Sequence, residues 1–227
     1  MGLEMIEIVS ATKRSSDDFA RNSALGISLH RLKADRSITA YIASNNSQPL
    51  ATIYKSRIEA TSDADTLVFV HDDVWIEDFF LSANLEGALK TFDVVGVAGA
   101  LRRYPGQPAW HSLAGTMQFD MQNISGAVAH GPRPFGRVVY YGKAPAECQL
   151  LDGVFLAAKK ATLLNAGVRF DPQFAFHFYD LDFCRTAQSN GLRLGTWTIP
   201  LTHQSKGNFE SSQWSETLAA YRAKWGD

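Results

Sequence analysis

Short apolar runs, separated by polar turns and by segments with helical spacing, organise the N-terminal half of the chain. Four of these runs predict buried strands, at residues 5–9, 38–43, 67–70 and 94–98. The segments between them carry apolar residues three and four positions apart, which predicts helices with one buried face. Strands that alternate with helices predict a parallel sheet with crossover helices on its faces.

Three amphipathic helices are predicted in this half of the chain. The first follows two acidic residues that favour a helix start, and its apolar face consists of Leu25, Leu29 and Leu32. The second starts at Pro49, a residue suited to the first turn, and its apolar face consists of Leu50, Ile53, Tyr54 and Ile58. The third is expected to start near Trp75, and its apolar face consists of Ile76, Phe79, Phe80, Ala83 and Leu89.

The chain changes character after residue 100. Five of the eight prolines fall within residues 101–150 together with several aromatic residues, which predicts short, partly antiparallel strands and loops rather than a long helix. Further on, strands are expected at residues 151–156 and 192–199, and helices at 159–165 and 180–191. The tail has a predicted helix face that consists of Trp214, Leu218, Tyr221 and Trp225.

Together these elements predict one α/β domain over the 227 residues. Its expected core is a Rossmann-like, mostly parallel central sheet flanked by helices, with a smaller, partly antiparallel segment. Within the domain we distinguish residues 1–100, residues 101–207 and a C-terminal helix at 208–227. The composition is that of an ordinary globular protein, because 45% of the residues are apolar and 20% are charged.

Charge and cysteine content narrow the partners and the compartment. The net charge of −1 gives no overall attraction to nucleic acid or to an anionic membrane. The two cysteines, Cys148 and Cys184, lie outside any CxxC pattern, so neither a disulfide framework nor a structural zinc site is expected. No apolar run approaches the roughly 20 residues of a membrane span, and the N-terminus lacks a secretory pattern. We therefore expect a soluble cytoplasmic protein without a transmembrane segment.

The candidate chemistry lies where the apolar run at residues 67–70 ends abruptly in His71, Asp72 and Asp73. Ligands of open α/β sheets bind outside the carboxyl ends of the strands. Two adjacent carboxylates repel each other there unless a cation compensates for their charge. If His203 joins them, two oxygen ligands and an imidazole suit Mg²⁺ or Mn²⁺ shared with a diphosphate, whereas zinc usually has more nitrogen or sulfur ligands.

Each of these residues also has a structural interpretation, and the spacing alone does not decide between the two. Asp72 or Asp73 could cap a following helix, since Asp is a preferred N-cap residue. Asp180 could be a catalytic base or a partner of the helix dipole, and Asp182 fits the dipole role. His203 taken alone is typical of a hydrogen-bonded structural histidine.

Three segments that carry acidic residues, a histidine or both follow one another in a characteristic order. They are VFVHDDV (68–74), FHFYDLDFC (176–184) and IPLTHQSKG (199–207), and LLDGVFLAAKK (150–160) precedes the second. In this order they resemble the motifs of a nucleotide-sugar glycosyltransferase of the GT-A fold, in the family-2-like group. The resemblance covers the chain from about Met5 to His203.

The match to the family pattern is residue by residue, with two departures. The first segment resembles the DxD region, with His71 at the first acidic position and Asp73 at the last. The second resembles the family's acidic helix start, with Tyr179 in place of the usual Glu and Asp180 retained. The third resembles the segment that supplies a metal-binding histidine, here His203, and residues 150–160 resemble the acceptor-side segment.

The resemblance implies a role for each matching residue. Asp73 and His203 would hold Mn²⁺ or Mg²⁺, and the ion would hold the donor diphosphate. The nucleotide would be contacted by Ala11, Thr12, Arg14, Ser44, Asn45, His71 and Asp72. Asp180 would be the general base towards an acceptor hydroxyl, which predicts inversion at the anomeric carbon. Residues 1–100 would then be a nucleotide-binding half and residues 101–207 an acceptor and metal half.

We therefore expect a metal-dependent glycosyltransferase that uses a nucleotide diphosphate sugar, with a UDP-sugar favoured, and an acceptor that the sequence does not specify. The alternative is a non-catalytic UDP- and metal-binding module, because His71 and Tyr179 replace usual acidic residues. A sugar nucleotidyltransferase is disfavoured, since the loop at residues 10–14 has no glycine.

Overall fold

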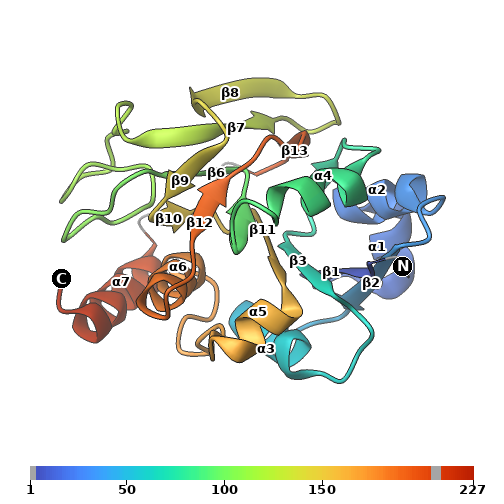
Figure 1. The fold of residues 1–227 in the computed structure, drawn as a ribbon, viewed down its shortest axis with the longest axis horizontal. Helices are drawn as coiled ribbons and strands as arrows, with labels where there is room; N and C mark the ends of the chain where they lie inside the picture. Colours follow the sequence, from blue (N-terminus) through green and yellow to red (C-terminus); the bar gives the residue numbers. More distant parts are fainter. Residues whose placement is uncertain (1–3, 206–210) are drawn as a thin grey trace.

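A computed structural model describes residues 4–205 and 211–227 of the chain, and Figure 1 shows its fold. The described residues form two sheets. The larger has seven strands, in the spatial order β2 (Ile38–Ala43), β1 (Ile6–Ala11), β3 (Thr66–Val70), β11 (Phe155–Lys159), β5 (Val94–Gly96), β12 (Leu194–Thr196) and β9 (Ala146–Cys148). Only β11 and β9 run antiparallel to their neighbours, so the other five of the seven strands point the same way. The predicted mostly parallel central sheet is therefore confirmed.

The smaller sheet has six strands and is mainly antiparallel. Its order is β10 (Leu150–Leu151), β6 (Ala98–Ala100), β7 (Ile124–His130), β13 (Leu201–His203) and β4 (Val74–Ile76), with β8 (Arg137–Gly142) paired to β7. The single parallel pair is β7 with β13. This sheet contains the partly antiparallel segment that the proline-rich stretch predicted, and its strands β7, β8 and β13 lie in the upper part of Figure 1.

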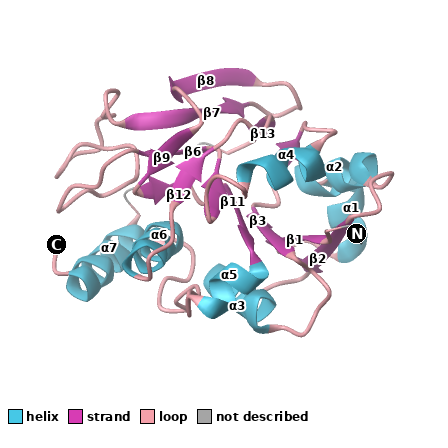
Figure 2. Ribbon diagram, in the orientation of Figure 1, coloured by secondary structure: helices cyan, strands magenta, loops and turns pink. Residues whose placement is uncertain are grey.

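The helices of the described residues are α1 (Ser16–Asn22), α2 (Ala24–Leu32), α3 (Leu50–Glu59), α4 (Leu81–Ala88), α5 (Lys160–Asn165), α6 (Tyr179–Ser189) and α7 (Ser212–Trp225). Figure 2 shows α3 and α5 together beneath the larger sheet, and α6 beside α7 near the C-terminus. Residues 208–210 of the predicted C-terminal helix lie outside the described residues. None of the helices in the described ranges combines the length and the apolar character needed to cross a membrane.

Strand β3 lies in the middle of the larger sheet and is buried on both faces. None of its five residues is more than 2% exposed. Strands covered on both faces are continuous apolar runs, and burial of each large apolar side chain contributes about 1.5–3 kcal/mol. The charged residues after Val70 therefore mark the point where the chain leaves the core.

The predicted first helix is two helices, because Ser23 interrupts it. The Ser23 hydroxyl donates to the Phe19 carbonyl at 2.7 Å and accepts from the Gly26 N–H at 2.8 Å. The residue therefore caps α2 while it ends α1, which is a common role of serine at helix N-termini. The leucine face predicted for this region belongs to α2 alone.

The helix predicted from Trp75 is wrong at its start. Residues 74–76 form β4, antiparallel to β13, and α4 begins only at Leu81. Phe79 and Phe80, expected on the buried face, are 64% and 78% exposed. Val, Trp and Ile fit a pleated, half-buried surface better than a helix, and a short apolar run does not distinguish the two.

Three predicted strands are shorter than expected or divide. The run at 94–98 passes from β5 in the larger sheet to β6 in the smaller one. The run at 151–156 divides at a turn between β10 and β11, and only residues 194–196 of the run at 192–199 form a strand. An apolar run reports burial, and both sheets bury these residues in a common core.

Candidate metal and catalytic site

The tip at residues 71–73 follows β3 and is flanked by the start of β11. Strand β11 runs antiparallel to β3 with Phe155 opposite Val70, so the turn before β11 lies beside the end of β3. The His71 N–H donates to the Val154 carbonyl at 3.4 Å. Sheet register thus places Asp152 and its neighbours next to the tip, although they are about eighty residues away in sequence.

His203 reaches the same tip from the smaller sheet. It ends β13, which pairs antiparallel with β4 so that His203 lies opposite Val74. The Gln204 N–H donates to the Asp73 carbonyl at 3.0 Å, and His203 Nε2 lies 3.3 Å from Asp73 Oδ1. Strand β4, which was predicted to be the start of a helix, is therefore the element that brings His203 to Asp73.

His71, Asp73 and His203 form one group of potential metal ligands. One side-chain ligand atom from each lies within 4.8 Å of the others, and all three residues are partly buried. Ligands about 2.0–2.2 Å from one ion lie within about 4 Å of each other, so small side-chain rotations close this group around a cation. The donor set therefore fits a divalent ion. Lys206 and Gly207, which end the histidine motif, lie outside the described residues.

The electrostatics of this group favour one ionised carboxylate between two different imidazoles. Burial opposes ionisation of Asp73, but the hydrogen bond and charge of His203 hold the pKa of the Asp73 carboxyl at about 2. Burial also opposes protonation of His203, and Asp73 nevertheless raises the pKa of that imidazole. Burial lowers the pKa of His71 despite the nearby carboxylates. Asp73 is thus ionised at neutral pH, and the lowered pKa of His71 keeps that imidazole neutral.

Asp180 lies at the start of α6 and is held by two backbone donors. Its Oδ2 accepts from the Gly153 N–H at 2.9 Å, and its Oδ1 accepts from the Leu181 N–H at 2.9 Å. Burial, followed by repulsion from Asp152, raises the pKa of Asp180 to about 7 despite these bonds. A carboxyl with such a pKa can accept a proton near neutral pH.

Tyr179 connects Asp180 to the metal-ligand group. Its hydroxyl donates to the Gly153 carbonyl at 2.8 Å and contacts His71 Nε2 at 2.8 Å. Gly153 in turn donates to Asp180, so the tip of β3, the turn before β11 and the start of α6 form one hydrogen-bonded site. His203 lies 3.3 Å from Asp73 at the same tip, so the three segments 68–74, 176–184 and 199–207 all contribute to this site.

The start of α6 is supported by α7. Phe178, directly before α6, has a left-handed φ of 62°, a conformation that is strained for a side chain of this size. Its buried ring lies 5.4 Å from the ring of Trp214 and 5.3 Å from that of Tyr221. Strained backbone conformations that are held in place by surrounding packing are common at functional sites.

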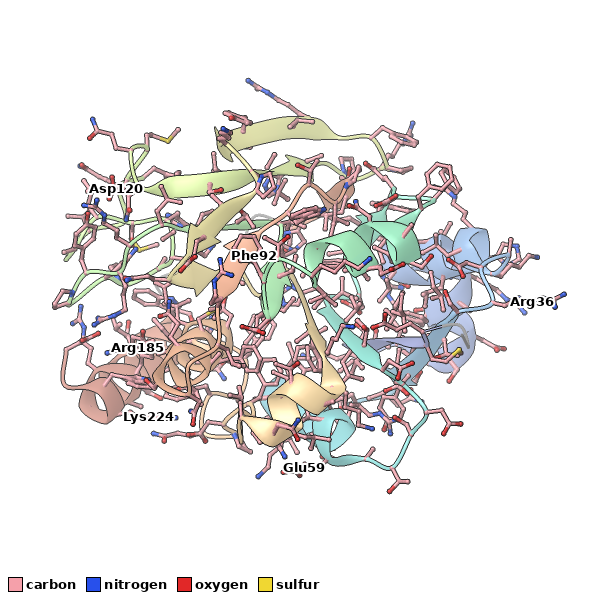
Figure 3. The ribbon with its side chains drawn as sticks, in the orientation of Figure 1. Arg36, Glu59, Phe92, Asp120, Arg185 and Lys224 are labelled. Atoms are coloured by element: carbon pink, nitrogen blue, oxygen red, sulfur yellow. The ribbon has the colours of Figure 1, made fainter. Side chains whose placement is uncertain are left out.

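Asp182 has a structural role. It is fully buried, its Oδ1 lies 2.8 Å from Lys224 Nζ, and it accepts from Trp225 Nε1 at 2.8 Å. Figure 3 labels Lys224 on α7 and Arg185 on α6, where the two helices meet. Asp182 thus joins α6 to α7, which goes beyond the dipole interaction expected from the sequence.

The residues expected to contact a nucleotide lie at the carboxyl ends of β1, β2 and β3, which are parallel and share one edge of the sheet. The loop after β1 is hydrogen-bonded to the turn after β2. The Thr12 backbone N–H donates to the Ala43 carbonyl at 2.9 Å, and the Asn45 N–H donates to the Arg14 carbonyl at 2.8 Å. This arrangement gathers Ala11, Thr12, Arg14, Ser44, Asn45, His71 and Asp72 at that edge. Arg14 is exposed and paired with Asp18 at 2.7 Å.

Asp152 is a site residue that the sequence reasoning did not single out. Its charge acts on His71, Asp180 and His203, and its Oδ1 accepts from the Val154 N–H at 3.0 Å. A usable signal existed, because Asp152 interrupts an apolar run in the same way as the tip after β3. The hydrogen bond between Tyr179 and His71 had no such signal.

Neither the sequence models of known protein families nor the curated protein sequences give a match to this chain. Solved structures do match it. The catalytic domain of Drosophila beta1,4-galactosyltransferase 7, in complex with xylobiose, aligns with a TM-score of 0.55 and 9% identity, over 95% of this chain and 79% of that chain. GalNAc-T7 with UDP, GalNAc and Mn²⁺ aligns with a TM-score of 0.53 and 9% identity, over 97% of this chain and 48% of that chain.

These similarities establish the fold of the chain as the GT-A glycosyltransferase fold. They confirm the fold that the sequence motifs implied. This chain spans about half the length of the GalNAc-T7 chain. Membership of the family-2-like group stays a prediction.

Proposed function

We propose that this chain is a metal-dependent glycosyltransferase that moves a sugar from a nucleotide diphosphate sugar to an acceptor hydroxyl, with a UDP-sugar as the favoured donor. The observation that carries the proposal is the convergence of Asp73, His203 and Asp180 at one end of a GT-A glycosyltransferase fold. The solved GalNAc-T7 structure contains UDP, GalNAc and Mn²⁺, which supports the same ligand classes here.

The donor would be held from two sides. Asp73 and His203 would hold Mn²⁺ or Mg²⁺, and the loops after β1 and β2 would line the base and ribose. The ion, when bound, supplies positive charge that stabilises the departing nucleoside diphosphate. Residues 1–100 would thus serve mainly as the nucleotide-binding half and residues 101–207 as the acceptor and metal half, within the single domain.

Asp180 would take the proton from the acceptor hydroxyl as that oxygen attacks the anomeric carbon. Its pKa of about 7 suits a general base near neutral pH, and its two backbone bonds fix the direction of the carboxylate. Direct attack opposite the leaving group inverts the anomeric configuration. A product that keeps the donor configuration would remove this role from Asp180.

A non-catalytic UDP- and metal-binding module is the second candidate. One observation favours it: Tyr179 occupies the position of a usual Glu, and its hydroxyl is already engaged by Gly153 and His71. Transfer would then have to proceed with one carboxylate fewer than the family pattern. Nucleotide binding is common to both candidates, so a binding test comes first.

Thermal unfolding with UDP, GDP, dTDP and CDP, each with and without Mn²⁺, tests the nucleotide site. A ligand at about 100 times its dissociation constant stabilises the fold by roughly 2.7 kcal/mol, which is readily measured. We expect a metal-dependent increase in melting temperature with UDP. If no nucleotide raises the melting temperature even with metal, both candidates are wrong.

Cleavage of UDP-sugars then separates enzyme from module. We expect metal-dependent release of UDP that Asp180→Asn abolishes while UDP binding persists. UDP binding without release of UDP from any donor would favour the module. Release that Asp180→Asn leaves unchanged would exclude Asp180 as the base.

A further inference from the structure

His71 occupies the position where the sequence resemblance has a carboxylate, and its ring lies inside the metal-ligand group. The ring centroid of His71 is 5.7 Å from that of His203, and one ring nitrogen belongs to the set of atoms within 4.8 Å of each other. Only one of the two ring nitrogens can serve as a ligand at a time. The nitrogen that donates a hydrogen bond carries the proton, and the second nitrogen is then free to bind the metal.

The contact with Tyr179 fixes the tautomer of His71. A tyrosine hydroxyl has a single proton, and the Gly153 carbonyl, 2.8 Å away, can only accept. The Tyr179 hydroxyl therefore donates to Gly153. At its 2.8 Å contact with His71 Nε2 the tyrosine oxygen must accept, so Nε2 carries the proton. The lone pair of the neutral imidazole is then on Nδ1.

Packing holds this arrangement in place. Tyr179 is only 3% exposed, so its hydroxyl is not free to turn to solvent. A methyl group on Gly153 would overlap the Tyr179 hydroxyl, so only glycine leaves room for the tyrosine there. The ring of Phe176 also stacks on His71, with ring centroids 6.0 Å apart and planes at 23°. In metal sites, the ring nitrogen that does not bind the metal usually donates a hydrogen bond to a neighbouring group, which orients the ring. The Tyr179 hydroxyl is in the position of such a group.

We propose that His71 is a third protein ligand of the ion, through Nδ1, and that Tyr179 is the positioning residue that presents this nitrogen. Two imidazoles and one carboxylate prefer transition ions such as Mn²⁺, Co²⁺ or Zn²⁺ over Mg²⁺, which prefers oxygen ligands. The inference rests on the proposed function in placing the ion at this group. It assigns His71 to the metal rather than to the nucleotide, and it narrows the cofactor to an ion that accepts nitrogen.

Calorimetric titration of the metal-free full chain with Co²⁺, Mn²⁺ and Mg²⁺, without nucleotide, tests the ligand set. His71→Gln keeps an amide N–H near the position of Nε2 but has no donor atom at Nδ1. We expect it to weaken Co²⁺ binding by about 10–100-fold. His71→Asp restores a carboxylate and should shift the preference towards Mg²⁺. His30→Gln, at an exposed position in the last turn of α2, is the matched control and should bind Co²⁺ as the wild type does.

Long-range ¹H–¹⁵N spectra of the histidine rings test the role of Tyr179 on the folded wild type. We expect the Nε2-protonated tautomer at His71 and a mixture of tautomers in Tyr179→Phe, with Co²⁺ binding weakened by about 10–100-fold. A purely structural role for Tyr179 would leave the tautomer unchanged. An Nδ1-protonated His71 in the wild type would overturn the inference without any variant.

The outcomes separate this inference from the proposed function. Unchanged Co²⁺ affinity in His71→Gln, a preference of the wild type for Mg²⁺, or no binding of any of the three ions overturns the inference. Ion binding that depends on His71, in a chain that binds no nucleoside diphosphate, supports the inference and contradicts the proposed function. Metal-dependent UDP binding that does not depend on His71 supports the proposed function and contradicts the inference.

Discussion

The raised pKa of Asp180 makes a prediction about stability that does not require a substrate. In the folded chain this pKa is about 7 instead of the ordinary 3.8, because of burial and the charge of Asp152. The folded state therefore holds the proton more tightly than the unfolded state. The stability that this proton contributes is present at low pH and is lost as the pH rises from the unfolded value to about 7.

The magnitude follows from the size of the pKa shift. Each pH unit between the two pKa values corresponds to about 1.4 kcal/mol, so the wild type should lose about 3 kcal/mol between about pH 5 and about pH 8 through this group alone. Asp180→Asn has no titrating proton and escapes this loss. The substitution also lowers the free energy of unfolding by an amount that does not change with pH, since the amide does not titrate. The amide has one acceptor oxygen for the two N–H groups of Gly153 and Leu181, and the unmet hydrogen bond costs about 1–3 kcal/mol.

The assay is urea unfolding of metal-free wild type and Asp180→Asn at about pH 5 and about pH 8. We expect the variant to be less stable than the wild type at the lower pH and to equal or exceed it at the higher pH. Asp17→Asn, at an exposed position in the first turn of α1, is the matched control and should follow the wild type. A stability difference between Asp180→Asn and the wild type that stays constant with pH would refute the reasoning.

Three further perturbations test other parts of the structure. Metal affinity should fall by about tenfold per pH unit below the pKa of His203, because a protonated imidazole cannot bind an ion and Asp73 raises this pKa. Metal titrations at several pH values check this. Lys224→Met should cost about 3 kcal/mol in urea unfolding, because it removes the cation beside the buried Asp182. Gly153→Ala should lower Co²⁺ affinity by about tenfold or more in calorimetry, because the added methyl displaces the Tyr179 hydroxyl.

Matched variants control for the substitutions themselves. Lys90→Met removes an exposed pair with Glu86 and should change stability by less than about 0.5 kcal/mol. Gly87→Ala adds a methyl in α4 whose nearest neighbour is Trp197 at 3.9 Å, so Co²⁺ affinity should not change. The role of Lys224 would be contradicted if Lys224→Met and Lys90→Met changed stability equally. The role of Gly153 would be contradicted if Gly153→Ala and Gly87→Ala changed Co²⁺ affinity equally. Metal affinity that is constant with pH would contradict the role of His203.

Elements that depend on local pattern were predictable from the sequence. Strand β2 has the predicted bounds, and β1, β3 and α5 lie within a few residues of theirs, since each combines an apolar run or stripe with a clear boundary. The α/β class followed from the order of these elements. The tip after β3 was identified for the same reason, because a charge that ends a buried run is visible in sequence.

Elements that depend on pairing between distant strands were not predictable. The run at 94–98 divides between two sheets, and β4 becomes a strand because β13 pairs with it. This pairing, set by tertiary contacts, brings His203 beside Asp73. The sequence resemblance predicted one metal site for these two residues, and the structure places His203 Nε2 3.3 Å from Asp73 Oδ1. The sequence did not reveal the nearby charge of Asp152 or the hydrogen bond between His71 and Tyr179.

The central claim is that one divalent ion, held by Asp73 and His203, binds the diphosphate of a nucleotide at the edge formed by β1, β2 and β3. A crystal structure of the chain with Mn²⁺ and UDP, with diffraction data collected at the manganese absorption edge, tests it most directly. We expect a single strong anomalous peak between Asp73 and His203, in contact with the UDP diphosphate. A peak away from these two side chains, or UDP bound elsewhere on the chain, would contradict the account.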